Sequence, residues 1–205
     1  MANVKITDMT AASTPLAGTE LLEIVQSGVS VKAAAADIGN SANALPFASL
    51  SGRAYISAYD TSDQTGSTGA ATAVKMNTTG FSAGISVANN GSGVPTRITF
   101  AAAGTYMLAP SIQFKNTDAN DHDATIWFRK NGTDIANSAT IISIPKAADG
   151  GAGFFQIVFY EQVTAAQYIE VMWLPENAAV TIDYIAAGAI APAVPSVILV
   201  SERIA

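Results

Sequence analysis

Between about Arg53 and the end of the chain, several segments alternate apolar and polar residues with a period of two. In one segment, Ile126 and Phe128 fall on one face of an extended backbone, and Thr125 and Trp127 fall on the other. A period of two is typical of β-strands with one buried face, because successive side chains point to opposite sides of a strand. This pattern predicts β-structure for most of the chain.

Turn-forming sequences, such as Asn89–Gly93 and Asn131-Gly132, separate the alternating segments. Many short strands with turns between them and no long helix predict an all-β fold, specifically a jelly-roll β-sandwich. The segments predicted as strands are Arg53–Tyr59, Ala71–Met76, Gly84–Ala88, Thr96–Ala101, Gly104–Lys115, Ala124–Lys130, Thr140–Ile144, Gly153–Val163, Gln167–Leu174, Val180–Ile185 and Ser196–Ile204.

The composition changes near residue 45, which predicts an N-terminal arm over residues 1–45 and a jelly-roll domain over residues 46–205. Within the arm, Leu21–Gln26 and Val29–Val31 flank Ser27-Gly28, a pattern that favours a β-hairpin. A segment of about 40 residues cannot build a core alone. The arm therefore has to pack on its own domain, on a symmetry mate or on a foreign partner.

The charge content excludes several classes of protein. Hydrophobic residues make up 49% of the chain and charged residues 13%, with a net charge of −6 and no cysteine. Disorder is excluded by the apolar content, and disulfides and cysteine-ligated zinc are excluded by the lack of cysteine. Binding to nucleic acid through a basic surface is not expected, because it needs clustered Lys and Arg.

Membrane insertion is not expected either. The most apolar stretch, Tyr184 to Val200, contains Pro192 and Pro195 and is shorter than the roughly 20 residues that span a bilayer. It reads as a loop followed by a buried strand. The N-terminus lacks the apolar core of a signal peptide, which favours assembly in a cytoplasm.

An acidic loop with the only histidine of the chain is the first place to look for chemistry. Its polar residues resemble a calcium loop at two positions, but Arg129 stands where the distal Glu should be. We therefore predict no metal site and treat the loop as a turn that could face a ligand, through Asp118, Asn120, Asp121, His122 and Asp123.

No catalytic residue is predicted. The chain has one histidine and no Gly-x-Ser-x-Gly elbow, and its glycine-rich runs lack the Lys-Ser/Thr of a phosphate-binding loop. We expect no cofactor and no enzymatic activity. Cleavage of cell-wall polysaccharide by a pair of carboxylates stays as the weakest alternative, because motifs alone do not exclude it.

The segment Phe154–Tyr160 carries apolar residues on both faces of its predicted strand. This pattern indicates burial on both sides. We expect one face to pack inside the sandwich and the other to pack against a neighbouring subunit, which also fits a surface with little charge.

Five segments of the predicted sandwich form a recognisable set, namely Gly52–Tyr59, Arg97–Tyr106, Ile126–Asp134, Gln167–Trp173 and Pro195–Val200. These segments resemble the jelly-roll domains related to tumour necrosis factor and the complement globular heads, and such domains are common in bacteriophage virion proteins. The resemblance covers residues 52–204 and rests on structural motifs. It implies a homotrimer in which three jelly rolls pack around a three-fold axis.

The N-terminal segment Ile6–Lys32 resembles the attachment segment at the start of many phage fibre and head-decoration proteins. This resemblance implies that residues 1–40 bind a phage capsid or tail protein. The apolar residues expected to anchor the arm are Leu21, Leu22, Ile24, Val29 and Val31. Because no shaft separates the arm from the jelly roll, a compact appendage is favoured over a long fibre.

Together these patterns predict a structural protein of the virion, namely a trimeric capsid decoration or head-fibre protein held by its arm. The alternative is a tail fibre or receptor-binding tip that recognises host-surface glycans through the loops Asn116–Asp123 and Ala147–Gly153.

Overall fold

The computed structural model describes residues 21–26, 29–34 and 53–205, and the chain divides after Gly52 into two compact units. In the first unit, β1 (Leu21–Gln26) pairs antiparallel with β2 (Val29–Ala34), with Ile24 opposite Val31. The predicted hairpin is confirmed, and its second strand extends beyond Val31. The domain boundary predicted between residues 45 and 46 lies outside the described residues.

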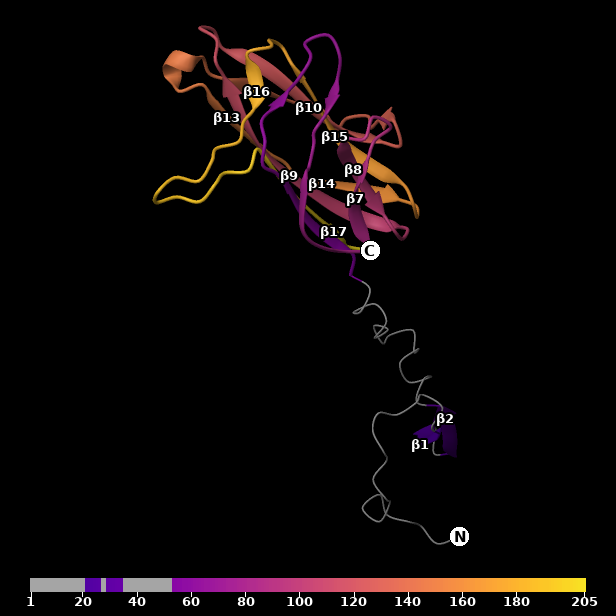
Figure 1. The fold of residues 1–205 in the computed structure, drawn as a ribbon. Coiled ribbons are helices and arrows are strands. Elements are labelled where there is room, and N and C mark those ends of the chain that lie inside the picture. Colours follow the sequence, from indigo (N-terminus) through magenta and orange to yellow (C-terminus); the bar gives the residue numbers. More distant parts are fainter. Residues whose placement is uncertain (1–20, 27–28, 35–52) are drawn as a thin grey trace. The chain divides into compact units, whose positions relative to one another are not determined.

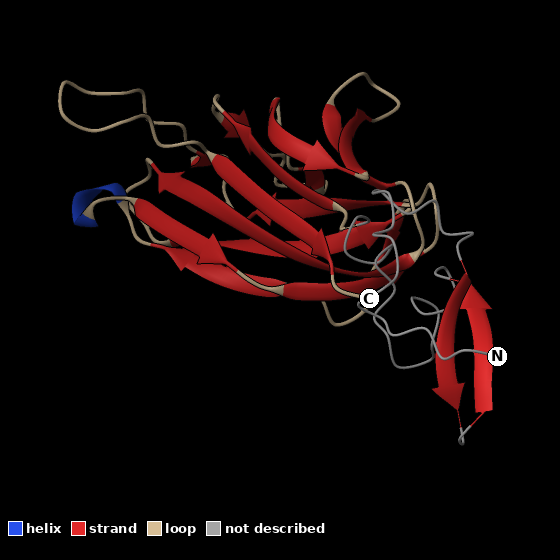
Figure 2. Ribbon diagram, turned by 90° about the horizontal axis from the view of Figure 1, so that it is seen from below, coloured by secondary structure: helices blue, strands red, loops and turns tan. Residues whose placement is uncertain are grey.

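The second unit is a sandwich of two antiparallel sheets (Figures 1 and 2). The sheet that we name the β9 sheet has eight strands. They are β3 (Tyr55–Asp60), β4 (Gln64–Thr65), β6 (Thr78–Ala83), β9 (Gly104–Asn116), β13 (Ala152–Gln156), β14 (Phe159–Val163), β16 (Val180–Ile182) and β17 (Val197–Arg203).

The other sheet, named the β15 sheet, has seven strands. They are β5 (Thr72–Ala73), β7 (Ile85–Asn89), β8 (Pro95–Phe100), β10 (His122–Lys130), β11 (Thr133–Asp134), β12 (Thr140–Ile144) and β15 (Tyr168–Pro175). A 3₁₀ turn, η2 (Ala147–Asp149), precedes β13. Among the described residues, no helix is long and apolar enough to cross a membrane.

The strand order confirms the predicted all-β jelly-roll sandwich. The first sheet contains the path β3–β17–β9–β14, and the second contains β8–β15–β10–β12. The chain therefore crosses repeatedly from one sheet to the other, as a jelly roll requires.

The core lies between the sheets and is filled by alternate side chains of the strands. Ile126 and Phe128 of β10 are buried, as the alternation predicts. Aromatic rings join the two sheets: the centroids of Phe100 and Tyr106 are 4.4 Å apart, and those of Phe114 and Trp173 are 5.9 Å apart. Trp173 is completely buried.

The strand predicted over Gly153–Val163 is two strands, β13 and β14, with Ile157 and Val158 between them. The register on either side places Pro110 of β9 opposite this break. Proline has no N–H to donate to the ladder, which explains the interruption.

Two other predicted strands are shorter than expected, and three strands, β4, β6 and β11, were not predicted. Only Thr72–Ala73 of the segment Ala71–Met76 forms a ladder, and β16 ends at Ile182. Strand β6 has the sequence Thr-Thr-Gly-Phe-Ser-Ala, which contains one large apolar residue and does not alternate.

We expect Trp173→Ala to lower the free energy of unfolding by about 3–5 kcal/mol, the cost of removing a large aromatic side chain from a packed core. Urea denaturation at one fixed protein concentration measures this. Ile141→Ala is the control, because Ile141 is 65% exposed, and it should cost less than about 0.5 kcal/mol. Equal losses in the two variants would contradict the described core.

Candidate functional site

The outer face of the β9 sheet is apolar and exposed. Across the strands, Phe81 of β6 stands opposite Ser57, which stands opposite Val200, which stands opposite Ala109. In the next row, Tyr55 and Met107 flank Glu202. Directly opposed residues share one face of a sheet, so these rows form one continuous surface.

This surface, which we name the apolar face, extends to the edge strands of the sheet. Tyr160 of β14 stands opposite Met107, and Phe154 of β13 stands opposite Gln113. The exposed large side chains of the apolar face are Tyr55, Phe81, Phe154, Val158, Tyr160, Ile198 and Val200, each 40–64% exposed.

The distribution of apolar residues over both faces of β13, expected from the sequence, is confirmed. Phe155 points into the core and is 6% exposed, while its neighbour Phe154 is 53% exposed. Strand β17 behaves in the same way: Val197 and Leu199 are buried, and Ile198 and Val200 are exposed. The burial expected for the whole of β17 is therefore found on one face only.

A long loop, residues 184–196, projects from the same sheet between β16 and β17 (Figure 1), and we name it the finger. Two backbone hydrogen bonds to Gln113 of β9 hold the base of the finger. The amide of Asp183, the residue before the finger, donates to the Gln113 carbonyl, and the Gln113 amide donates to the carbonyl of Ser196, each at 2.9 Å. Ile185 and Val194 form a bridge inside the finger. The finger contains no charged residue, and Ile190 is fully exposed.

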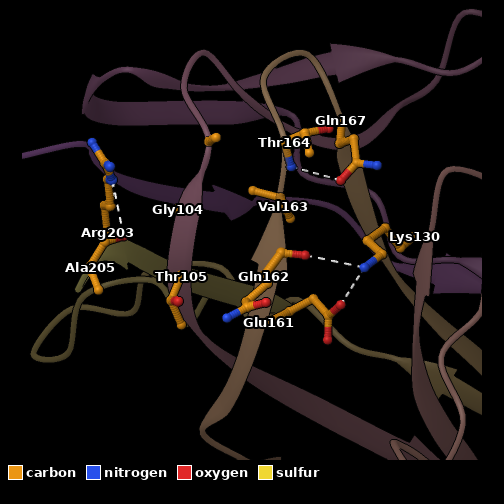
Figure 3. Close-up of a pocket in the computed structure, with 11 residues that line it drawn as sticks. Gly104, Thr105, Lys130, Glu161, Gln162, Val163, Thr164, Gln167, Arg203 and Ala205 are labelled. Atoms are coloured by element: carbon orange, nitrogen blue, oxygen red, sulfur yellow. Dashed lines mark hydrogen bonds and ion pairs between the residues drawn. The ribbon is translucent and has the colours of Figure 1, made fainter.

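A pocket of about 660 Å³ lies where β14 and β17 end and β9 begins (Figure 3). Its charged groups are paired within the protein. The ammonium of Lys130 contacts the Glu161 carboxylate and donates to the Gln162 carbonyl at 3.1 Å, and Arg203 Nε donates to the Ala205 carbonyl at 3.1 Å. Because these charged side chains already have partners within the protein, the pocket offers a ligand no unpaired charged side chain among its lining residues.

The acidic loop is held together by its own hydrogen bonds and by the loop after β12. The Ala147 amide donates to the Asp118 carbonyl at 2.9 Å, and the Lys146 amide donates to Asp121 Oδ1 at 2.8 Å. Asn116 Nδ2 donates to the Asn120 carbonyl at 2.8 Å, and the amide of Asp123 donates to Glu176 Oε2 at 2.9 Å.

His122 is the centre of the charges in this loop. Its Nε2 lies 2.7 Å from Asp118 Oδ2, and its Nδ1 lies 3.7 Å from Glu176 Oε2. The hydrogen bond to Asp118 raises the pKa of His122 above its ordinary value and lowers the pKa of Asp118. Within residues 53–205, no group of three or more His, Asp and Glu is arranged to hold a metal ion.

The five anchor residues lie in β1 and β2, and the five loop residues lie between β9 and β10 or at the start of β10. The sequence did not identify the finger as an exposed element or Phe81 as part of a surface. The lack of charge from Tyr184 to Val200 was the available signal for the finger.

No protein-family model matches this chain. No curated protein matches it. Among solved structures, three of murine APRIL are similar, at pH 8.5, pH 5.0 and pH 8.0, with 11%, 9% and 10% sequence identity. Their TM-scores are 0.47, 0.46 and 0.48, and each match covers 74% of this chain and 99% of that chain. A likeness of this extent supports no inference about ligands or partners.

We expect the pKa of His122 to lie above 6.5 and to fall most in Asp118→Asn, because the hydrogen bond to Asp118 is the largest cause of the shift. Glu176→Gln should lower it less and serves as the matched control. The imidazole proton resonances report the pKa by NMR, and the assignment is direct because the chain has one histidine.

The contribution of His122 to the free energy of unfolding is complete below pH 6.5, and it is lost as the pH rises through the raised pKa of His122. That of Asp118 is complete above pH 3.8 and is lost as the pH falls through its lowered pKa. A His122 pKa at or below 6.5 in the wild type, or a larger change in Glu176→Gln, would contradict the described pair.

Proposed function

We propose that the protein is a structural component of a bacteriophage virion, a homotrimeric capsid decoration or head-fibre protein bound to the particle through residues 1–40. The resemblances of Ile6–Lys32 and of residues 52–204 to phage proteins support the viral part of the proposal. The observation that carries the assembly part is the apolar face, which leaves several aromatic and aliphatic side chains exposed in a single chain.

Large contiguous apolar patches on a soluble chain mark sites of association. The apolar face has aromatic and aliphatic residues and few charges, which is the composition of the centre of an interface. A third row, in which Ile198 stands between Tyr59 and Ser111, lies next to the rows of Phe81 and Tyr55. These three rows contain one charged residue, Glu202. A second copy of the same chain is the proposed occupant, and closed symmetry allows each copy to cover the next.

The arm has a different role in this proposal. Its strands form a unit of their own, separate from the jelly roll. Extended strands can add to the edge of a sheet on another protein. Three arms in one trimer bind more tightly than one, because each bound arm raises the effective concentration of the others.

The alternative proposal is a tail fibre or receptor-binding tip that recognises host-surface glycans. One observation favours it: the two loops predicted to face a ligand are hydrogen-bonded to each other through Asp118, Asp121, Lys146 and Ala147. Two loops fixed together on a rigid sandwich are a common setting for recognition.

We expect the wild-type protein to sediment at three times its chain mass of 21.0 kDa. The variant Tyr160→Glu/Val200→Glu should sediment as a monomer, because it places two charges in the apolar face. Both residues are exposed in the single chain, so the fold should survive. Ile141→Glu, on the other sheet, is the matched control and should stay trimeric.

Analytical ultracentrifugation at micromolar concentration makes this comparison, with circular dichroism to check folding. A wild-type protein of 21.0 kDa, or a double variant that keeps the wild-type mass, would overturn the proposed association.

We expect deletion of residues 1–40 to give a folded trimer that no longer joins particles. Particles that lack the protein are mixed with full-length or truncated protein and then separated by density. The reason is that the anchor residues of β1 and β2 lie in the deleted segment.

Binding of the truncated protein to particles would show that the arm is not the anchor. The same particles distinguish the two proposals. Normal adsorption to host cells with fragile heads favours decoration, and loss of adsorption favours a receptor-binding tip.

A further inference from the structure

The outer face of the β15 sheet carries a row of four charged residues of alternating sign. Arg97 of β8, Glu170 of β15, Arg129 of β10 and Asp134 of β11 lie side by side. Glu170 stands opposite Arg129, and Arg129 stands opposite Asp134. Arg97 Nε lies 3.9 Å from Glu170 Oε1. We name this row the charge ladder, and its formal charges sum to zero.

The members of the charge ladder are fixed in position by their neighbours. Thr96 Oγ1 donates to Glu170 Oε1 at 2.6 Å. Arg129 Nε and Trp127 Nε1 each donate to Asp134 Oδ1 at 2.7 Å. These bonds hold the pKa of Asp134 below its usual range, so its carboxylate is charged at neutral pH.

Arg97 is fixed in a different way. Its guanidinium stacks over the ring of Tyr168, with the carbon Cζ 4.2 Å from the ring centroid. Its Nε is buried and has no hydrogen-bond partner in the protein. An unpaired buried donor costs free energy, while the Arg97 side chain as a whole is 32% exposed.

A pocket of about 380 Å³ lies over the charge ladder. This volume falls within the range of small-molecule sites, roughly 300–1,000 Å³. Small residues of the lining, including Ala73, Gly91 and Gly132, leave space above the charged groups. The loop at Gly91 is held by Asn90, whose Oδ1 accepts from the amides of Ser92 at 2.9 Å and Val94 at 3.1 Å.

We propose that this pocket binds one ring of a neutral saccharide. Two guanidinium groups supply donors, and the Glu170 carboxylate, 7% exposed, supplies an acceptor. A sugar hydroxyl both donates and accepts, so vicinal hydroxyls can satisfy both kinds of group at once.

Charge argues against other ligands. An anionic ligand would meet the buried carboxylate of Glu170, and a cationic ligand would meet Arg97 and Arg129. Burying a charge next to one of the same sign is unfavourable. The balanced charges of the ladder therefore favour a neutral polyol over an acidic sugar, a phosphate or a peptide amine.

This inference concerns a surface other than the acidic loop, and it does not rest on the proposed trimer. The apolar face belongs to the β9 sheet and the pocket belongs to the β15 sheet, on the opposite side of the sandwich. Covering the first leaves the second accessible.

The test uses the full chain on an array of neutral and uronic-acid oligosaccharides, followed by isothermal titration calorimetry with the glycan that binds best. We expect a neutral oligosaccharide to bind. Arg97→Gln should weaken it about tenfold or more, as expected for loss of hydrogen bonds to a charged group. Gly91→Tyr should also weaken it, because Gly91 lines the pocket and a Cβ there meets no neighbouring atom within 4 Å, which leaves room for a bulky ring beside the ligand.

Arg53→Gln is the matched control, because it removes an exposed arginine that does not line the pocket, and it should bind within twofold of wild type. Melting temperature checks that each variant folds. Absence of binding to any neutral glycan, binding to acidic glycans only, or wild-type affinity in both Arg97→Gln and Gly91→Tyr would overturn the inference. The sedimentation result is independent of all three outcomes.

Discussion

Strand β9 determines how the sandwich presents its surfaces. It bonds to β17 and β16 along one edge and to β13 and β14 along the other. Tyr106, Leu108, Ile112 and Phe114 are buried along one side of this strand. A shift of one residue in its register would turn these side chains outward and bring Gln113 and Lys115 into the core. The backbone pairing of one strand therefore decides which residues of its four neighbours are exposed.

The sequence predicted the elements whose signal is local. Alternation of apolar and polar residues was sufficient to predict β10, β15 and β17, because the period of two lies within each strand's own sequence. Strand β6 was missed because Thr78–Ala83 contains a single large apolar residue. The break between β13 and β14 also escaped prediction, since its cause, Pro110, lies in a different strand.

The candidate surfaces were less predictable because they depend on register between distant strands. The apolar residues on both faces of the strand at Phe154 and Phe155 predicted that one strand has a second apolar face outside the core. They gave no indication that Phe81 and Val200 continue that face, separated in sequence by more than half of the chain. Arg97, Glu170 and Arg129 are likewise adjacent only because β8, β15 and β10 pair side by side.

The two outer faces of the sandwich differ in chemistry, which gives the small number of charges in the chain a structural meaning. On the β15 sheet, four of the charged residues lie in a ladder where each has a neighbour of opposite sign. On the β9 sheet, Glu202 is the one charged residue in the three rows that cross Phe81, Tyr55 and Ile198. Burial of that face against another copy would therefore desolvate few charged groups, which are costly to bury.

An exposed sheet edge beside an apolar face carries a risk of unlimited association, because unpaired backbone groups recruit further strands. Strands β13 and β14 form such an edge, since within the described residues each pairs only with β9. The break opposite Pro110 divides this edge into two five-residue strands. Short, interrupted edges are poor templates for strand addition. Association through side chains of the apolar face is then favoured over edge-to-edge pairing, and in the proposed trimer closed symmetry would limit it to three copies.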